Sequence, residues 1–447
     1  MAYFRIRGGN PLKGSVTISG AKNAAVKMIV ASLLTSEEVR LSGVPAIDDV
    51  AVDIAVVKSL GARVEQKGSE VCLRADDIGA TEVPAELSSL TRAAVLALGP
   101  LLARFGKAAI PFPGGCPIGE RPVDRHLAAL EQLGAEIDCS GGVIRARADH
   151  LVGAPIRFEK TTVMGTENAI LAAVLAAGET TILGAAQEPE VDDLIELLSK
   201  MGATVARSEE DPGKIVIQGV ESLSGATHQI IPDRCEAVTF AVAAAATRGD
   251  IILENTRPQD LTAFLSKFEQ LGASYEVLGD KVRVWADPAV EFSPAALEVT
   301  PHPGFMTDWQ QPFSVLLAQA VGESTVHEFI YSQRFGYLSE LSKMGVVAEV
   351  LTPSEAGLAF VPEKYGFDWS EKEEPPVVAR ITGPSKLHGA EVKISDLRAG
   401  ATLVLAALAA EGESKVHGIE HIDRGYEAFG EKLAKLGADI ERVNGAA

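Results

Sequence analysis

The sequence is poor in cysteine and in aromatic residues, and it has no long apolar run. Its 447 residues include four cysteines, Cys72, Cys116, Cys139 and Cys235, and 5% Phe, Trp and Tyr. No Cys-x-x-Cys pair occurs, so neither a zinc site nor a disulfide framework is predicted. Apolar stretches such as AAVLALGPLLA are shorter than the roughly 18 to 20 residues that span a bilayer. The first residues, MAYFRIRGGN, lack a signal-peptide pattern. We therefore expect a cytoplasmic protein without a membrane partner.

Positive charge is scarce as well. The chain has 41 lysines and arginines against 61 aspartates and glutamates, which gives a net charge of −20. Binding to a phosphate backbone requires a basic surface, so nucleic acid is excluded as a general partner. An anionic ligand would need a local cluster of cations. A chain of 447 residues also exceeds the size of one hydrophobic core, and we expect two domains.

What the sequence does contain is an internal repeat. Six similar phrases, SLGARV, QLGAEI, KMGATV, QLGASY, KMGVVAEV and KLGADI, carry the glycines Gly61, Gly134, Gly202, Gly272, Gly345 and Gly437. The apolar residues before each glycine follow helical spacing, as in Phe264, Phe268 and Leu271. A glycine at the end of a helix is typical of a left-handed C-cap, and a strand-like stretch follows. Each unit is therefore predicted to contain an amphipathic helix, a cap and a strand.

Each unit also contains an earlier helix that is apolar on nearly every side. Examples are ENAILAAVLAAG, EAVTFAVAAAATRG, QQPFSVLLAQAVG and RAGATLVLAALAAEG. A helix without a polar face must be enclosed by other elements. We therefore predict two α/β domains of three units each, with apolar helices at the centre and sheets outside. The segment EKYGFDWSEKEEPP, residues 363–376, is charged and aperiodic, and it is predicted to be a surface insertion.

Charged residues gather where the apolar helices begin. Equivalent positions near these starts hold Lys22, Arg92, Arg234 and Arg398. Helix N-termini have free N–H groups and a positive dipole end, so they favour anions. The structural alternative is that Asp233, Asp308 and Asp396 are N-caps beside solvated cations. Asp233 would then form a capping box with Glu236.

A second equivalent position precedes the amphipathic helices. There the units read PGGCPIGERPVD, YSQRFGY and EHIDRGYEAF, so Cys116 shares its position with Arg334 and Arg424. Arginine suits the forked recognition of carboxylate and phosphate, although most arginines are simply exposed. Cys116 lies in a glycine-rich turn near Arg121 and Arg125, and such cations favour a thiolate. It is the candidate reactive cysteine, and an inert loop thiol is the alternative.

The motifs closely resemble those of the UDP-N-acetylglucosamine 1-carboxyvinyltransferase family, which are enolpyruvyl transferases. In chain order they are ISGAKNAA, PGGCPIGERPVD, PDRCEA, PHPGFMTDWQQPF, SDLRAG and HIDRGYE, and the similarity runs from Phe4 to Val443. The resemblance implies an inside-out α/β barrel fold with two domains, each of three repeats. By the same likeness one domain comprises residues 22–231, and the other combines residues 1–21 with residues 232–447.

The resemblance also implies a reaction. The enolpyruvyl group of phosphoenolpyruvate moves to the 3-hydroxyl of UDP-N-acetylglucosamine, and phosphate leaves through a tetrahedral intermediate. This is the first committed step of peptidoglycan synthesis, on which cell shape and cell division depend. A proton must be added to the enol methylene carbon and another removed from the sugar hydroxyl, so the site needs an acid and a base. The two substrates are the implied partners, no metal or organic cofactor is implied, and no oligomeric state is indicated.

The family's functional residues match positions of this chain one by one. Cys116 matches the proton donor, which also reacts with the antibiotic fosfomycin, and Asp308 matches the residue assigned as base. The cations at phosphoenolpyruvate match Lys22, Arg121 and Arg424, with Arg334 and Arg398 nearby. Lys22 and Arg398 are also expected to be catalytic, because fixed positive groups stabilise developing negative charge. The nucleotide-sugar contacts match Asn23, Arg92, Arg121, Pro122, Val123, Asp124, Arg125, Lys160, Thr162, Val163 and Ile330.

Two alternatives remain open. The shikimate-pathway enolpyruvyl transferases resemble the chain in repeat and mechanism, but they usually begin with PGSKS and lack the glycine-flanked cysteine loop. A regulatory homologue without turnover would be favoured by loss of Cys116, Asp308 or an active-site arginine, and all of these are present. The chain departs from the family pattern at Glu120, Arg125 and Met164, and the resemblance assigns no role to the insertion at 363–376.

Overall fold

The chain forms two compact units. The computed structural model describes residues 2–114, 123–369 and 372–444. Within these ranges unit 1 contains residues 2–19 and those from 232 onward, and unit 2 contains residues 20–114 and 123–231. The chain passes from unit 1 to unit 2 after Ser19 and returns after Ile231.

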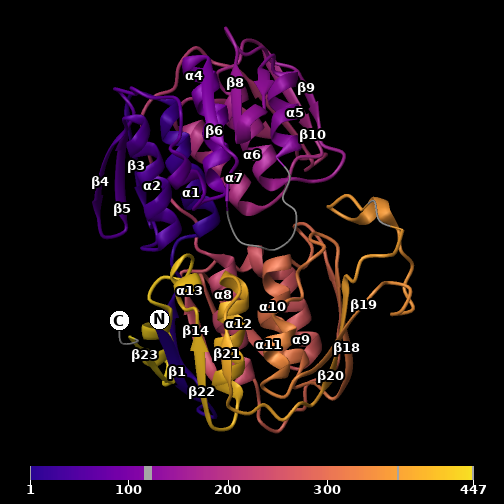
Figure 1. The fold of residues 1–447 in the computed structure, drawn as a ribbon. Coiled ribbons are helices and arrows are strands. Elements are labelled where there is room, and N and C mark those ends of the chain that lie inside the picture. Colours follow the sequence, from indigo (N-terminus) through magenta and orange to yellow (C-terminus); the bar gives the residue numbers. More distant parts are fainter. Residues whose placement is uncertain (1, 115–122, 370–371, 445–447) are drawn as a thin grey trace. The chain divides into compact units, whose positions relative to one another are not determined.

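Apolar helices occupy the centre of each unit, as the sequence predicts. In unit 1 they are α8 (Arg234–Ala246), α10 (Thr307–Leu317) and α12 (Leu397–Ala409). In unit 2 they are α1 (Lys22–Ala31), α4 (Leu98–Phe105), which follows the 3-10 helix η2 (Ala93–Ala97), and α6 (Val163–Ala173). All residues of α8 are buried, and α8, α10 and α12 pack side by side with strands around them (Figure 1). In the described ranges, no helix combines the length and the apolar character that crossing a membrane requires.

The described strands of unit 2 form sheets that enclose its central helices. The first sheet contains β13 (Ala226–Gln229), β3 (Glu38–Ser42), β5 (Glu70–Arg74) and β4 (Arg63–Lys67), in that order. The second contains β9 (Pro155–Arg157), β10 (Glu179–Leu183), β12 (Lys214–Gln218) and β11 (Thr204–Arg207). The third contains β6 (Lys107–Pro111), β8 (Val143–Arg147) and β7 (Glu136–Asp138), with a parallel bridge from Glu82 to Ala109.

Unit 1 repeats the same sheet pattern. Its first sheet contains β2 (Lys13–Thr17), β14 (Asp250–Glu254), β16 (Lys281–Trp285) and β15 (Ser274–Leu278). Its second contains β17 (Ala296–Val299), β18 (Gly322–Glu328), β20 (Val378–Gly383) and β19 (Val347–Leu351). Its third contains β21 (Glu391–Lys393), β22 (Glu413–His417), β1 (Tyr3–Arg7) and β23 (Asp439–Val443). Each sheet of unit 1 has one parallel pair followed by antiparallel pairs, as in the registers Ala296–Thr325 and Val326–Ala379.

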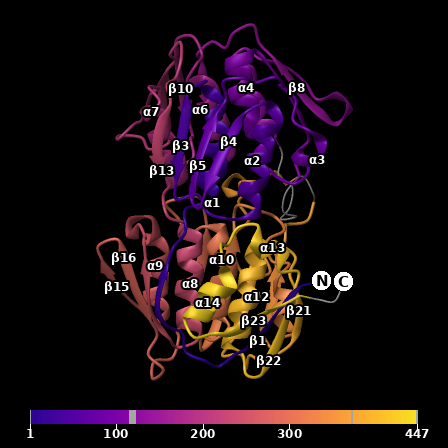
Figure 2. The same cartoon turned by 90° about the vertical axis from the view of Figure 1, so that its left-hand side faces the viewer.

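Strands from the start of the chain complete sheets formed by later residues. β1 lies between β22 and β23 and is antiparallel to both, with Ile6 opposite Ser414 and Ile440 (Figure 2). β2 pairs in parallel with β14, in register from Lys13 opposite Asp250. Both of the first strands therefore belong to unit 1, although most of that unit follows Ile231.

The predicted glycine caps are confirmed. All six repeat glycines have φ between 96° and 115°, a left-handed conformation that glycine adopts without steric cost. The helices before them are α2 (Asp48–Leu60), α5 (Asp124–Gln132), α7 (Pro189–Lys200), α9 (Thr262–Leu271), α11 (Leu338–Ser342) and α14 (Phe429–Lys435). The strands after them are β4, β7, β11, β15, β19 and β23.

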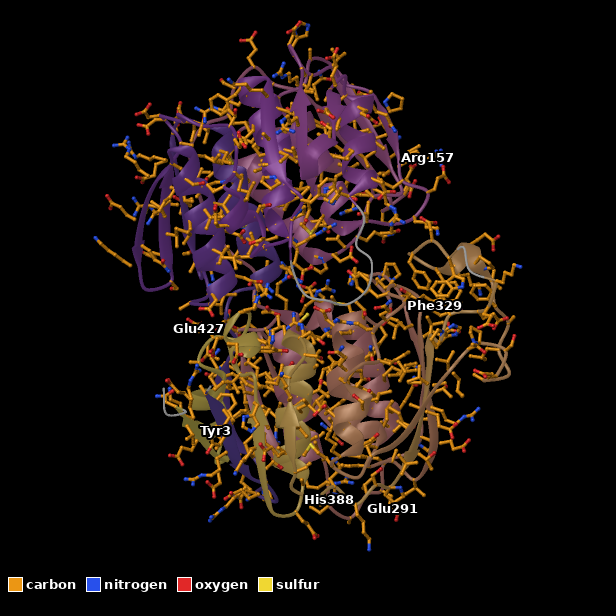
Figure 3. All side chains as sticks on the ribbon, viewed as in Figure 1. Tyr3, Arg157, Glu291, Phe329, His388 and Glu427 are labelled. Carbon is orange, nitrogen blue, oxygen red and sulfur yellow. The ribbon has the colours of Figure 1, made fainter. Side chains whose placement is uncertain are left out.

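The insertion at 363–376 is less exposed than its sequence indicates. Tyr365 is 2% exposed and packs in a small cluster with Phe329 and Val377. The Tyr365 hydroxyl and Nε2 of His327 are 2.8 Å apart, and the backbone N of Gly366 donates to the backbone O of Phe329 at 2.7 Å. Figure 3 labels Phe329 at this end of β18. The prediction of a surface insertion is therefore wrong at Tyr365, because its buried partners Phe329 and Val377 lie outside the segment and no local pattern reveals them.

Candidate functional site

Two arginines predicted as site residues of unit 1, Arg334 and Arg398, converge on Asp308. Asp308 is the second residue of α10, Arg398 is the second residue of α12, and Arg334 lies between β18 and α11. Oδ1 of Asp308 accepts a hydrogen bond from Nη2 of Arg334 at 2.8 Å, and its Oδ2 accepts one from Nε of Arg398 at 3.0 Å. Two arginines that are 64 residues apart in the chain therefore bind one carboxylate (398 − 334).

Burial differs sharply within this cluster. The side chains of Arg334 and Arg398 are 3% and 4% exposed, whereas that of Asp308 is 21% exposed. Burial alone would lower the pKa of Arg334, but Asp308, Asp396 and Glu328 together hold its pKa above the ordinary value. The arginines therefore remain cationic, and the carboxylate is the part of the cluster that solvent reaches most easily.

Two of the three predicted N-caps are confirmed. Oδ1 of Asp233 accepts from the backbone N of Cys235 at 2.7 Å and of Glu236 at 3.0 Å at the start of α8. Asp396 caps α12 in the same way, through the backbone N of Arg398. These aspartates thus satisfy helix N–H groups that would otherwise lack partners.

Asp308 is not an N-cap, so the alternative interpretation that all three aspartates cap helices is wrong for this residue. The N-cap of α10 is Met306, and Asp308 lies inside the first turn. Its two oxygens accept from guanidinium groups, which make stronger, charge-assisted hydrogen bonds than backbone N–H groups do. The structure therefore separates Asp308 from the two capping aspartates.

The predicted capping box is also wrong. The Glu236 carboxylate does not return to Asp233, because its Oε2 accepts from the backbone N of Ser19 at 2.8 Å and its Oε1 accepts from Nζ of Lys432 at 2.5 Å. The cause is two contacts that are distant in sequence. Ser19, 217 positions away, supplies a backbone donor, and Lys432, 196 positions away, supplies a cation. No local pattern at Asp233 reveals them.

Cys235 lies beside Asp308 but is not a candidate nucleophile. Its Sγ is 4.0 Å from Oδ2 of Asp308, and the residue is 3% exposed. Burial raises the pKa of its thiol well above the ordinary value. Cys139 is exposed and Cys72 lies within β5. Cys116, Arg121 and Pro122 are outside the described residues.

Other predicted residues of unit 1 lie on the connections that follow its strands. Ile330 is partly buried and its backbone N donates to Oε1 of Glu328 at 2.7 Å. Arg424 follows the short helix α13 (Glu420–Asp423) and is partly buried. Nη1 of Arg234, the first residue of α8, is 3.2 Å from Nδ1 of His302.

In unit 2 the predicted residues also lie at helix starts. Lys22 begins α1, and its Nζ is 2.6 Å from Oδ2 of Asp49 on α2. Thr162 is the N-cap of α6 and its hydroxyl accepts from the backbone N of Gly165 at 3.2 Å. The others are Asn23 in α1, Arg92 before η2, Val123 and Asp124 and Arg125 at the start of α5, Lys160 before α6, and Val163 as its first residue.

Several charged residues near these positions escaped the sequence analysis. Nζ of Lys27 is 2.9 Å from Oε1 of Glu167, both side chains are buried, and burial raises the pKa of Glu167 to about 7. Asp53, on α2 one turn after Asp49, is fully buried. The sequence signal that could have identified these residues was a charged side chain inside an otherwise apolar stretch. Across residues 2–114, 123–369 and 372–444, no group of three or more His, Cys, Asp or Glu side chains could hold a metal ion.

The comparison with known families agrees with this organisation. The family model for EPSP synthase (3-phosphoshikimate 1-carboxyvinyltransferase) matches residues 6–433. The chain belongs to the EPSP synthase family. This membership confirms the resemblance to enolpyruvyl transferases that the motifs indicate.

Curated relatives within the family match over the whole chain. The UDP-N-acetylglucosamine 1-carboxyvinyltransferase of Zymomonas mobilis subsp. mobilis is 43% identical over 454 residues, which cover 100% of both chains. The protein of the same name from Sorangium cellulosum is 44% identical over 449 residues, which cover 100% of this chain and 99% of the relative.

Solved structures confirm the predicted fold class. The enolpyruvyl transferase NikO from Streptomyces tendae has a TM-score of 0.84 and 25% identity, and covers 100% of this chain and 99% of its own. EPSP synthase from Acinetobacter baumannii has a TM-score of 0.69 and 19% identity, with 99% of this chain and 100% of its own covered, and supports the fold alone.

Proposed function

We propose that the chain transfers the enolpyruvyl group of phosphoenolpyruvate to the 3-hydroxyl of UDP-N-acetylglucosamine and releases phosphate. The observation that carries the proposal is the 43% and 44% identity, over the full chain, to two proteins named UDP-N-acetylglucosamine 1-carboxyvinyltransferase. The charged cluster around Asp308 supports it, because the reaction needs a base beside fixed cations.

The reaction balances as an addition followed by an elimination. Protonation of the methylene carbon and attack of the sugar oxygen on the adjacent carbon form a tetrahedral, phosphate-bearing intermediate. Loss of a proton from the new methyl group and cleavage of the carbon–oxygen bond to phosphate then restore the double bond. The products are the enolpyruvyl ether and inorganic phosphate.

Asp308 is the proposed base for the sugar hydroxyl. An ionised carboxylate offers about four lone-pair sites, and here one site on each oxygen is used by an arginine. The side chain is 21% exposed, so a substrate hydroxyl can approach the carboxylate, whose lone pairs accept the hydroxyl proton. The arginines fix the direction in which those lone pairs point.

Cys116 is the proposed acid for the methylene carbon, on the strength of the motif PGGCPIGERPVD. Arg121 and Arg125 in the same stretch favour thiolate character once the proton has left. Fosfomycin is expected to modify the same thiol. Pro122, Val123 and Asp124 complete the stretch proposed to contact the nucleotide sugar.

The proposed cations reconcile two anionic substrates with a net charge of −20. Lys22, Arg121 and Arg424 bind the phosphate and carboxylate of phosphoenolpyruvate, and Arg334 and Arg398 assist. Positive groups held in place before the reaction stabilise the leaving phosphate without reorganisation. Asn23, Arg92, Lys160, Thr162, Val163 and Ile330 contact the nucleotide sugar in this proposal. The reaction is the first committed step of peptidoglycan synthesis in the cytoplasm.

The test is phosphate release from phosphoenolpyruvate by the purified chain. We expect release with UDP-N-acetylglucosamine and none with either substrate alone. The family description favours 3-phosphoshikimate as a second candidate acceptor, so it is supplied in a parallel reaction. Release with 3-phosphoshikimate alone would replace the proposed acceptor. No release with either acceptor would favour the regulatory alternative.

A further inference from the structure

Glu328 is a buried carboxylate that the proposed reaction does not use. It is the last residue of β18 and is 0% exposed. A buried carboxylate is costly unless hydrogen bonds or charges compensate for the lost water. Its partners therefore show what the residue does.

One oxygen of Glu328 binds the backbone that leaves the sheet. Oε1 accepts from the backbone N of Ile330 at 2.7 Å and from the backbone N of Tyr331 at 3.3 Å. These residues begin the connection from β18 to α11, which also contains Arg334. The carboxylate thus ties the start of this connection to the end of the strand.

The other oxygen reaches Arg334 through a threonine. The Thr307 hydroxyl donates to Oε2 of Glu328 at 2.8 Å, and the Thr307 oxygen accepts from Nε of Arg334 at 3.3 Å. A hydroxyl has a single proton, so donation to Glu328 turns its lone pairs toward Arg334. Arg334 in turn donates to Asp308 through Nη2.

These contacts form one continuous series from Glu328 through Thr307 and Arg334 to Asp308. Thr307 and Asp308 are adjacent at the start of α10, so the series joins the end of a strand to the start of a central helix. Removing the carboxylate would release two backbone N–H groups and would let the Thr307 hydroxyl rotate toward Arg334.

We infer that Glu328 is a positioning residue for the proposed reaction, which fixes the backbone at Ile330 and orients the Arg334 guanidinium through Thr307. The inference deepens the proposed function and rests on it. Glu328 touches no reacting atom in this account. It acts through the residues proposed to contact both substrates.

Kinetics of Glu328→Ala and Glu328→Gln test the inference. Loss of the hydrogen bonds to the backbone N–H groups and to Thr307 is expected to raise KM for both substrates about tenfold in Glu328→Ala, with a smaller fall in kcat. Glutamine keeps an acceptor for the backbone but cannot accept on both sides, so Glu328→Gln is expected to show partial rescue, with KM raised about threefold. Wild-type KM values in folded Glu328→Ala would overturn the inference.

A double-mutant cycle with Thr307→Val tests the route to Arg334. Glu328→Gln is expected to raise KM less in the Thr307→Val background than in the wild type, because the hydroxyl that it acts through is absent. If the two substitutions change KM by independent factors, so that their free-energy effects simply add, the route through Thr307 is overturned.

Tyr365→Phe is the matched control. His327 and Glu328 are consecutive strand residues and point to opposite faces, and Tyr365 bonds to His327 at 2.8 Å. This variant removes a buried hydrogen bond at the same strand end without touching Thr307 or Arg334, so KM is expected to stay unchanged. A rise in KM equal to that of Glu328→Ala would overturn the inference.

Hydrogen exchange without substrate separates the inference from the proposed function. The Ile330 and Tyr331 amides are expected to exchange about tenfold faster in Glu328→Ala than in the wild type, because both lose their acceptor. Unchanged exchange would overturn the positioning role. If the wild type shows no acceptor-dependent phosphate release, the proposed function fails, and the exchange rates alone decide whether Glu328 positions the connection.

Discussion

Arg334 and Asp308 form an ion pair in which the cation is buried and the anion is the more exposed partner. Nη2 and Oδ1 are 2.8 Å apart, and the side chains are 3% and 21% exposed. A buried guanidinium requires a nearby anion to offset the loss of its hydration. The carboxylate therefore stabilises the arginine, and the arginine in turn orients the carboxylate. Changes at Asp308 are therefore expected to affect both turnover and stability.

Asp308→Asn is expected to lower kcat at least about a hundredfold, because an amide cannot accept the hydroxyl proton. It is also expected to reduce the free energy of unfolding by about 1–3 kcal/mol, since two buried arginines lose their shared anion. Phosphate release and urea denaturation measure the two effects. The control is Asp250→Asn, which removes an exposed partner of Arg283 and should cost less than about 1 kcal/mol. Unchanged kcat in Asp308→Asn would exclude the base assignment.

Cys116→Ser is expected to lower turnover strongly without a change in the free energy of unfolding, because a hydroxyl is a much weaker acid than a thiol. Inactivation by fosfomycin is expected to disappear with the thiol. Cys139→Ser is the matched control, since Cys139 is exposed and its loss should change neither quantity. Wild-type turnover in Cys116→Ser would remove the proton-donor role and leave the fold assignment intact.

The cap glycines predict a graded loss of stability. Gly61 and Gly202 have φ of 115° and 98°, but a Cβ on Gly61 would lie 2.4 Å from the backbone O of Asp77, whereas one on Gly202 would have open space. Gly202→Ala is expected to cost about 1–2 kcal/mol from backbone strain alone. Gly61→Ala is expected to cost about 1–3 kcal/mol more because of the clash. Equal losses in denaturant titrations would contradict the steric argument.

Asp53 predicts a pH dependence of stability. Burial raises the pKa of its carboxyl to about 8, whereas an aspartate in an unfolded chain titrates near 3.9. Between these values the folded state retains a proton that the unfolded state has lost, so this group makes stability fall as pH rises, by at most about 1.4 kcal/mol per pH unit.

Asp53→Asn removes the titration and keeps the shape. Its stability relative to the wild type is therefore expected to increase from pH 5 to pH 8 and then level off. Urea denaturation at pH 5, 7 and 9 measures the difference. Asp250→Asn is the control, because Arg283 lowers the pKa of Asp250 and no gain is expected over that range. A constant difference between Asp53→Asn and the wild type would show that the carboxyl does not titrate there.

Much of the fold could be predicted because its determinants are local. The repeat glycines mark helix ends, and the helix from Arg234 to Ala246 has no polar face that could contact water. Lys22 and Arg398 could be placed at helix starts for the same reason. These features depend on residues within a few positions of one another.

The rest depends on contacts between distant residues. Asp308 and Asp233 occupy similar local sequences, but only Asp233 caps a helix, because Asp308 binds arginines 26 and 90 positions away. Glu328 lies in the run STVHEFIYSQ, where nothing local distinguishes a buried carboxylate from an exposed one.

The position of β1 between β22 and β23 constrains the order in which the sheets can form during synthesis. The ribosome releases β1 first, but its two neighbours are among the last strands to be made. All described strands of unit 2 are complete once Gln229 has been added. Domains generally fold as units during synthesis. Unit 2 can therefore finish folding before unit 1, although unit 1 contains the first residues of the chain. The opening strand of the protein waits for nearly the whole translation time before its sheet can close.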